Sequence, residues 1–216
     1  MLTSVDVRQD RGDHDLGHIL PLDPHSAVIC GRSGCGKTVF ILDTLEGHYR
    51  ALFQHIVILC PTIEYNKAYQ GRHWIWTDPE VYVVNPGERI HDYLRAFYTV
   101  FEGEPTLYIV DDCSATKALT KKKDMLSELA FSGRHASQSV WVSTQRYNSV
   151  LKDLREQTRW VALFHCKDRD SFEDCLREND VIQSKDERSA VRQLLAETKH
   201  AKLVLKTDQP TAYAVV

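Results

Sequence analysis

The chain lacks the features that would place a protein in a membrane or outside the cell. No apolar run in its 216 residues approaches the length of about 18 that a membrane-spanning helix requires. The first residues, Met1 to Asp6, contain neither the basic segment nor the apolar stretch of a secretory signal. From these absences we expect a soluble, intracellular protein that is not secreted.

Paired cysteines are also missing. The chain has six cysteines but no C-x-x-C pair, and most of them lie within or at the ends of apolar runs. Such thiols are typical of a reducing compartment, so we expect free, buried cysteines and neither a disulfide framework nor a zinc site. The six are Cys30, Cys35, Cys60, Cys113, Cys166 and Cys175.

An excess of positive charge is the third absence. Lys and Arg total 27 against 30 for Asp and Glu, which gives a formal net charge of -3. This balance provides no global attraction to nucleic acid, so any DNA contact must be local. The length and a hydrophobic content of 43% suit one large α/β domain with a complete core.

The first 25 residues are polar and rich in Asp and His. Their spacing is irregular, so we interpret this segment as solvated surface rather than as a metal site. The sequence therefore divides into an N-terminal polar segment, residues 1–25, and a single domain, residues 26–216. The Asp and His residues in question are Asp13, His14, Asp15, His18, Asp23 and His25.

One complete phosphate-binding motif is present. It has the pattern G-x-x-x-x-G-K-[ST] and lies between an apolar run at 27–30 and another at 39–42. Glycines let backbone N–H groups approach a phosphate chain closely, and the following helix adds its positive end. Lys37 would reach the β and γ phosphates, and Thr38 would bind Mg²⁺. The predicted nucleotide-binding residues are Gly31, Arg32, Ser33, Gly34, Cys35, Gly36, Lys37 and Thr38.

The rest of the chain alternates short apolar runs with stretches of helical character. Continuous apolar strands are buried on both faces, as in parallel sheets, and the alternation predicts a three-layer α/β fold. A capping box at Ser184 to Glu187 opens a helix to about Lys199, and a C-terminal hairpin closes the sheet edge. We predict strands at 55–60, 81–84, 107–110, 140–142, 161–164, 201–206 and 211–215, and helices at 38–45, 90–101, 121–132, 150–157 and 169–177.

The strand at 107–110 ends in two carboxylates, which is the form expected of a second nucleotide motif. Asp111 would hold Mg²⁺ through water, and Asp112 would orient the attacking water or accept its proton. At least one other strand separates this one from the phosphate loop. That order favours an ATPase with a catalytic acid over a small-molecule kinase.

Two further residues are candidates for catalysis. Gln145 follows a buried strand, and its amide can donate to the γ phosphate and accept from the lytic water. Arg134 precedes that strand, where a neighbouring subunit in a ring could present it to developing phosphate charge. Its structural alternative is a surface arginine at the end of the 121–132 helix. Arg146 and Arg155 are alternatives for the same catalytic role.

Together these residues resemble the viral genome-packaging ATPases of the FtsK/HerA superfamily, in the branch found in poxviruses, other large DNA viruses, virophages and Polinton-like elements. Four blocks carry the match: residues 29–38, the Cys60-Pro61 turn, residues 109–112, and Ser132 to His135 with Ser143 to Gln145. The resemblance implies a RecA-like, ASCE-type P-loop NTPase core. It also implies a pentameric or hexameric ring that uses ATP and Mg²⁺ to move double-stranded DNA into a capsid.

By this resemblance, Arg134 corresponds to the trans-acting finger and Gln145 to the polar sensor. One position departs from the pattern, because ring motors of the wider superfamily usually have Glu where this chain has Asp112. The shorter side chain lies further from the attacking water. The resemblance therefore implies hydrolysis that is slow without a partner or DNA.

Four lysines after the second motif are candidates for DNA contact. Lys117, Lys121, Lys122 and Lys123 would line a ring lumen and meet phosphates without reading bases; the alternative is a solvated charge run. We further expect the pKa of Cys35 to be depressed, since its thiol lies at a helix N-terminus beside Lys37. Two other functions stay open, a P-loop kinase of a small acceptor and a nucleotide-dependent assembly or regulatory protein that does not translocate DNA.

Overall fold

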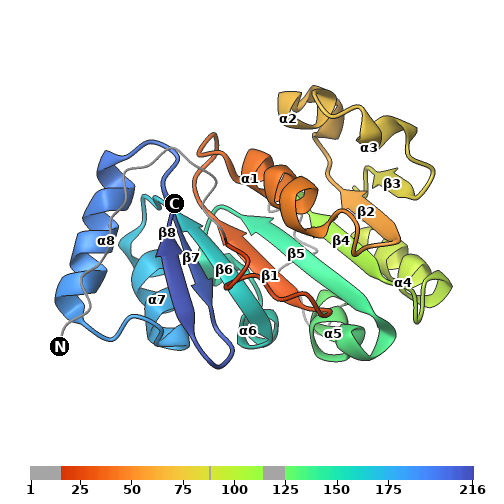
Figure 1. Ribbon diagram of the computed structural model, residues 1–216. Helices are drawn as coiled ribbons and strands as arrows, with labels where there is room; N and C mark the ends of the chain where they lie inside the picture. Colours follow the sequence, from red (N-terminus) through yellow and green to blue (C-terminus); the bar gives the residue numbers. More distant parts are fainter. Residues whose placement is uncertain (1–15, 88, 114–124) are drawn as a thin grey trace.

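The computed structural model describes residues 16–87, 89–113 and 125–216. A single eight-stranded sheet runs through the molecule, with helices against both of its faces (Figure 1). The strand order is β3-β2-β4-β5-β1-β6-β7-β8. The first six strands in this order are parallel, whereas β7 is antiparallel to β6 and β8 to β7. The predicted three-layer α/β fold with a C-terminal hairpin is confirmed.

The strands match the apolar runs of the sequence. They are β1 (Ser26–Cys30), β2 (His55–Leu59), β3 (Val81–Val84), β4 (Thr106–Val110), β5 (Gln138–Thr144), β6 (Thr158–Phe164), β7 (Lys202–Lys206) and β8 (Ala212–Val215). Every residue of β1, β2, β4 and β5 is buried, which explains why their sequences do not alternate between apolar and polar.

Successive residues of these strands contribute to two different cores. Val28 and Val57 belong to one cluster, whereas Ile29 and Ile58 belong to the other. This division follows from the period of two in a strand, which turns neighbouring side chains to opposite faces. The sheet is therefore the common wall of two apolar layers.

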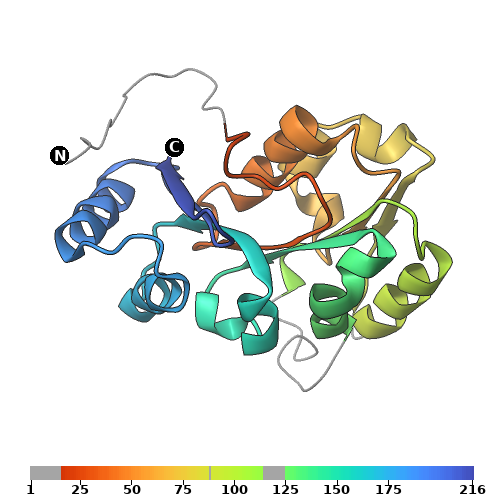
Figure 2. The same cartoon turned by 60° about the horizontal axis from the view of Figure 1, so that its bottom comes forward.

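Different helices cover the two faces (Figure 2). One layer is formed by α1, α2, α3 and residues 16–20, and the other by α4 to α8. The helices are α1 (Lys37–Thr44, continued by a π-helical turn at Leu45–Tyr49), α2 (Lys67–Gln70), α3 (Trp74–Thr77), α4 (Ile90–Val100), α5 (Met125–Ser132), α6 (Lys152–Glu156), α7 (Arg169–Asn179) and α8 (Lys185–Glu197).

The helices α2 and α3 were not predicted from the sequence. Each has four residues, too few to show a helical period. The N-cap of α2 is Asn66, whose side chain accepts from the backbone N–H of Ala68 at 3.0 Å. Both helices lie between β2 and β3, near the carboxyl end of the parallel strands (Figure 1). The first part of the predicted 121–132 helix lies outside the described residues.

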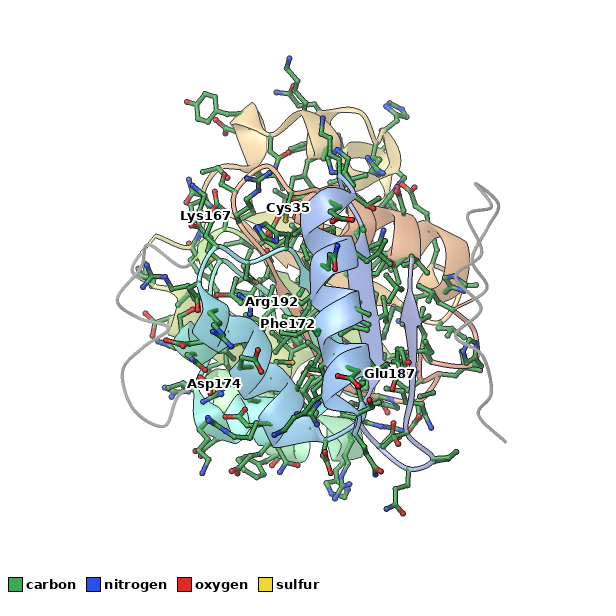
Figure 3. All side chains as sticks on the ribbon, turned by 90° about the vertical axis from the view of Figure 1, so that its left-hand side faces the viewer. Cys35, Lys167, Phe172, Asp174, Glu187 and Arg192 are labelled. Carbon is green, nitrogen blue, oxygen red and sulfur yellow. The ribbon has the colours of Figure 1, made fainter. Side chains whose placement is uncertain are left out.

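The helices α7 and α8 pack side by side, and Phe172 lies between them (Figure 3). As predicted, Ser184 caps α8, because its hydroxyl accepts from the backbone N–H of Glu187 at 3.4 Å. The Glu187 carboxylate does not close the capping box as expected. It accepts instead from the hydroxyl of Tyr213 on β8, so a tertiary contact replaces the local one.

The last part of the N-terminal segment differs from the prediction of a solvated surface. Leu16, Ile19 and Leu20 join the core under α1, and His25 is only 4% exposed. His25 Nδ1 donates to the Asp23 carbonyl at 2.7 Å, and its Nε2 accepts from Trp141 Nε1 at 2.9 Å. These buried residues are interspersed with polar ones, so the sequence pattern did not reveal that they reach the core. Asp13, His14 and Asp15 lie outside the described residues.

All six cysteines are free, as predicted. Among the helices in the described part of the chain, none combines the length and the apolar character that a membrane crossing requires.

Burial lowers the pKa of His25 to about 4, which makes stability depend on pH. Between pH 6.5 and 4, His25 is protonated in the unfolded chain but not in the folded protein. The free energy of unfolding therefore falls as the pH falls. We expect the titration of His25 to lower the free energy of unfolding by about 3 kcal/mol across that window. The variant His25→Gln keeps a donor and an acceptor but does not titrate. Urea unfolding from pH 4.5 to 7 should show a shallower slope for His25→Gln than for wild type, and parallel slopes would contradict the assignment.

Candidate functional site

A cavity of about 380 Å³ lies at the carboxyl ends of β1, β4 and β5. In open parallel sheets, ligands bind at this edge, because the loops that follow the strands gather there. The cavity brings together the phosphate loop, the two carboxylates and residues 143–145, whereas the Cys60-Pro61 turn and Arg134 do not line it. It is lined by Ser33, Gly34, Gly36, Lys37, Thr38, Val39, Asn66, Ala68, Asp111, Asp112, Ser143, Thr144, Gln145 and His200.

The phosphate-loop motif connects β1 to α1 in a conformation that requires glycine at two positions. A Cβ at Gly31 would come within 2.6 Å of Phe164 Cβ and 2.7 Å of Cys35 Sγ, so a side chain there would clash. Gly36 has φ 105°, a left-handed conformation that other residues adopt only with strain. Phe40 N bonds to the Gly36 carbonyl at 2.9 Å, which joins the loop directly to the first turn of α1.

Lys37 folds back over the loop. Its ammonium donates to the Gly31 carbonyl at 2.7 Å and to the Arg32 carbonyl at 3.1 Å. These are neutral acceptors, and a polyphosphate would be a much stronger partner for the same charge. The loop therefore holds the cation within the cavity without neutralising it.

The second motif meets the phosphate loop through Asp111, whose side chain is 2% exposed. The Thr38 hydroxyl donates to Asp111 Oδ2 at 2.7 Å. The Tyr69 hydroxyl donates to the same oxygen at 3.0 Å. Asn66 Nδ2 lies 3.5 Å from Thr38 Oγ1, so α2 contributes two side chains to this cluster.

Asp112 is exposed and has φ 54°, in the left-handed region. Its Oδ2 accepts from the hydroxyl of Thr62 at 2.9 Å, and Thr62 lies just beyond the end of β2. The left-handed turn separates the two adjacent carboxylates. Asp111 is therefore enclosed by hydroxyl donors, whereas Asp112 borders the open cavity.

The end of β5 supplies the remaining wall. Ser143 pairs in register with Ile29 of β1, and exposed Gln145 follows the strand. The Ser143 hydroxyl is buried but has no hydrogen-bond partner within the part of the chain that the structure describes. A buried hydroxyl normally has a partner, so this one is available to a ligand or a metal-bound water.

These residues fit a magnesium ion bound together with a phosphate chain. Thr38 and Asp111 are hard oxygen ligands, and Mg²⁺ usually binds through one or two such groups plus substrate phosphates and water. Within the described ranges no cluster of three or more His, Cys, Asp or Glu forms a separate metal cage. The donor set therefore suits a metal that arrives with the nucleotide.

Arg134 lies away from this cavity. It belongs to the 3₁₀ turn Gly133–Ala136 before β5, whereas Gln145 follows the same strand. The seven residues of β5 span about 20 Å, so Arg134 lies at the opposite end of the sheet. There it lines a second cavity of about 460 Å³.

The two alternative arginines differ in their partners. The side chain of Arg155 is 11% exposed, and its Nη1 binds both carboxylate oxygens of Glu178, at 2.5 and 2.7 Å. Its guanidinium also lies 5.0 Å from the centre of the Tyr147 ring. Arg146 is exposed next to Gln145. The guanidinium of Arg155 is thus occupied by contacts within its own chain, whereas that of Arg146 is accessible. Lys117, Lys121, Lys122 and Lys123 lie outside the described residues.

The expectation for Cys35 is wrong. Burial raises the pKa of its thiol, and this effect outweighs the nearby charge of Lys37. The side chain is 8% exposed, behind the upper end of α8 (Figure 3). The helix end and the lysine are local features, but Cys35 belongs to a buried apolar cluster and its sulfur lies against Gly31.

Four residues of the site were missed by the sequence analysis. Thr62, Asn66 and Tyr69 come from the segment between β2 and β3 and contact Asp112, Thr38 and Asp111. His200 comes from the loop before β7, and its Nδ1 donates to the Cys35 carbonyl at 2.9 Å. Only Cys60-Pro61 pointed to the first segment. His200 had no local signal, although its φ of 67° marks an unusual turn.

The accessible thiol near the loop is Cys166, not Cys35. Cys166 is half-buried, and a hydrogen bond with Cys30, whose sulfur lies 3.8 Å away, lowers its pKa. Since the thiolate is the reactive form, iodoacetamide at neutral pH should label Cys166 before Cys35. Peptide mass spectrometry over a time course measures both rates, with urea-unfolded protein as the control in which the two label alike. Faster labelling of Cys35 in the folded protein would contradict this.

Solved structures with the same fold include two packaging proteins. The genome packaging NTPase B204 from Sulfolobus turreted icosahedral virus 2, in complex with AMP, matches with a TM-score of 0.65 and 15% identity, over 91% of this chain and 98% of that one. B204, the DNA-packaging ATPase from Sulfolobus Turreted Icosahedral Virus, gives 0.63 and 14%, over 89% and 97%. The pCW3 conjugation coupling protein TcpA gives 0.55 and 14%, over 89% and 60%.

At these identities the likeness shows the fold alone, that of a P-loop NTPase. No curated protein sequence matches the chain. The sequence profile of the Poxvirus A32 protein, in contrast, matches residues 18–209, which include the phosphate loop, both carboxylates and the C-terminal hairpin as far as its turn. The chain belongs to the Poxvirus A32 protein family.

Proposed function

We propose that this protein is an ATPase that packages double-stranded DNA into a viral capsid. The observation that carries the proposal is the convergence of Lys37, Thr38, Asp111, Asp112 and Gln145 on one cavity at the carboxyl edge of the sheet. Membership of the Poxvirus A32 protein family and the fold shared with the packaging NTPase B204 support it. We take residues 26–216 as the single ATPase domain.

The residues of the cavity have separate roles in hydrolysis. Backbone N–H groups of residues 31–38 bind the phosphate chain, and Lys37 leaves the Gly31 and Arg32 carbonyls to reach the β and γ phosphates. Thr38 and Asp111 hold Mg²⁺, which neutralises charge on the phosphates when bound. Asp112 accepts a proton from the attacking water, and Gln145 orients that water.

The hydrogen bond between Thr62 and Asp112 bears on the rate. A carboxylate that accepts from Thr62 has one oxygen engaged, and the side chain of Asp is one methylene shorter than that of Glu. Both features would hold the Asp112 carboxylate away from the attacking water in a single isolated chain. We therefore propose a slow basal rate that rises when DNA or a neighbouring subunit shifts Asp112 from Thr62.

The position of Arg134 supports a shared active site. About 20 Å of β5 separates it from the cavity of its own chain, so its guanidinium can assist hydrolysis only in another copy. We propose a pentameric or hexameric ring in which Arg134 completes the neighbouring site. The pairing of Arg155 with Glu178 makes Arg155 a weaker candidate, and Arg146 is the accessible alternative.

DNA would pass through the lumen of this ring. The net charge of -3 offers no general attraction, so contacts with phosphates must be confined to a loop. We propose that Lys117, Lys121, Lys122 and Lys123 make these contacts without reading bases. A capsid component is the expected second partner, and assembly of virus particles inside a host cell is the expected setting.

Duplex DNA should stimulate ATP hydrolysis by the wild-type protein. In the triple variant Lys121→Ala, Lys122→Ala, Lys123→Ala, the ratio of rates with and without DNA should fall to one, because the phosphate contacts are gone. Phosphate release at saturating ATP measures both rates. Lys37→Ala, in which hydrolysis should drop by about a hundredfold or more, controls for contaminating ATPase. Full stimulation of the triple variant would refute the lysine contact, and DNA-independent wild-type hydrolysis would refute the packaging proposal.

A trans-acting Arg134 should make mixed rings poor enzymes. As Arg134→Ala protein is added to wild type at constant total concentration, activity should fall more steeply than the wild-type fraction, because each variant subunit disables a neighbouring site and one disabled site slows the coordinated turnover of its whole ring. Arg95→Ala, at an exposed arginine of α4, is the matched control and should leave activity unaffected. A linear decline with Arg134→Ala would show that the sites work independently, and wild-type activity of pure Arg134→Ala protein would remove Arg134 from the mechanism.

A further inference from the structure

The Asp111 carboxylate has an unusual second donor. Thr38 and Tyr69 both donate to Oδ2, at 2.7 and 3.0 Å, and neither of these hydroxyls uses Oδ1. Thr38 belongs to the phosphate loop, so its contact with Asp111 is expected of the nucleotide site. Tyr69 belongs to α2, which lies outside the motifs that predicted the site, and it is completely buried.

We propose that Tyr69 is a positioning residue of the metal site: its hydroxyl holds the Asp111 carboxylate through Oδ2, so that Asp111 would be in place to hold Mg²⁺ when a magnesium nucleotide binds. This inference rests on the proposed function, because it assigns a role to Tyr69 only if a magnesium nucleotide binds in the cavity. Tyr69 itself does not bind the metal. It acts through Asp111, as outer-shell partners of metal ligands commonly do.

The direction of the hydrogen bond is fixed by chemistry. An ionised carboxylate can only accept, so the phenol must donate. Burial raises the pKa of Tyr69 well above its usual value, and the nearby Asp111 charge acts in the same direction. Both effects favour the protonated phenol, which is the form that can donate.

The two donors are not equivalent once nucleotide binds. Thr38 has one proton and must also offer a lone pair to the metal, so its position responds to the ligand. Tyr69 has no second task and lies in the core with Ile63 and Ile75. Among the described residues, Thr38 is the other side chain that donates to the Asp111 carboxylate, so removal of the Tyr69 hydroxyl would leave this carboxylate held by a residue that is itself assigned to the metal.

The backbone of Tyr69 is held as firmly as its ring. Its carbonyl accepts from Trp76 Nε1 at 3.3 Å. Arg72 donates to the Ala68 carbonyl at 2.9 Å and also binds Asp43 of α1 and Glu46 of the following turn, the latter at 3.1 Å. These contacts clamp α2 to the helix that follows the phosphate loop. A fixed α2 gives the phenol a fixed distance to Asp111.

The test is Tyr69→Phe, which keeps the ring and removes only the hydroxyl. A fluorescent ATP analogue is titrated at increasing Mg²⁺, and again in EDTA. We expect Tyr69→Phe to need about tenfold more Mg²⁺ for half-maximal enhancement of binding, while the affinity in EDTA is unchanged. Electron paramagnetic resonance of Mn²⁺ with the protein and nucleotide should show the same weakening without any turnover.

Tyr108→Phe is the matched control, because Tyr108 is also fully buried and donates to Gln138 Oε1 at 2.8 Å, away from Asp111. It should keep the wild-type Mg²⁺ requirement. If Tyr69→Phe needs the same Mg²⁺ concentration as wild type, the inference is overturned. An equal loss of nucleotide affinity in Mg²⁺ and in EDTA would also overturn it, because such a loss would show a structural role. If the nucleotide affinity of the wild-type protein does not depend on the Mg²⁺ concentration, the proposed metal site itself is overturned.

Discussion

The buried carboxylate of Asp111 is the constraint around which the site is built. A carboxylate in an apolar environment is costly unless hydrogen bonds compensate for the lost water. Here two hydroxyls donate to it, from the phosphate loop and from α2. Three segments that are distant in sequence are therefore tied to one side chain. Their mutual arrangement is what creates a cavity that suits a magnesium nucleotide.

The parallel sheet makes this convergence possible. β1 lies between β5 and β6, and β4 lies between β2 and β5, so the phosphate loop, Asp111 and Gln145 emerge at one edge. Burial of β1, β4 and β5 on both faces fixes the register of these strands. A slip by one residue would turn the apolar side chains of a strand to the wrong layer and displace its functional end. The rigidity of the core thus sets the precision of the site.

The two ends of the sheet divide the chemistry. The carboxyl edge holds the cavity and the exposed carboxylate of Asp112, which accepts from Thr62, whereas the other edge presents Arg134 in a separate cavity. One chain therefore contains all parts of the proposed mechanism but cannot bring them together. The proposed assembly of copies, each placing its amino edge against the next chain's carboxyl edge, would resolve this separation and would make hydrolysis dependent on neighbours.

The sequence by itself determined the phosphate-loop motif, the two carboxylates and the positions of the strands along the chain, because each depends on consecutive residues. It also determined that the thiols are unpaired. The same local reasoning failed for Cys35, since its pKa depends on burial by distant residues rather than on the adjacent helix end. It failed for residues 16–25 as well, where three apolar anchors among polar residues reach the core.

Only the tertiary structure decided which groups complete the site. Tyr69, Thr62 and His200 have no motif, and their roles come from contacts across 42, 50 and 165 positions of the chain. The Glu187 carboxylate likewise accepts from Tyr213 on β8 instead of closing the capping box at Ser184. A local pattern specifies backbone conformation and chemistry over a few residues. Burial and hydrogen-bond partners depend on how the whole chain packs, and these are the quantities that set the charge, orientation and accessibility of each functional group.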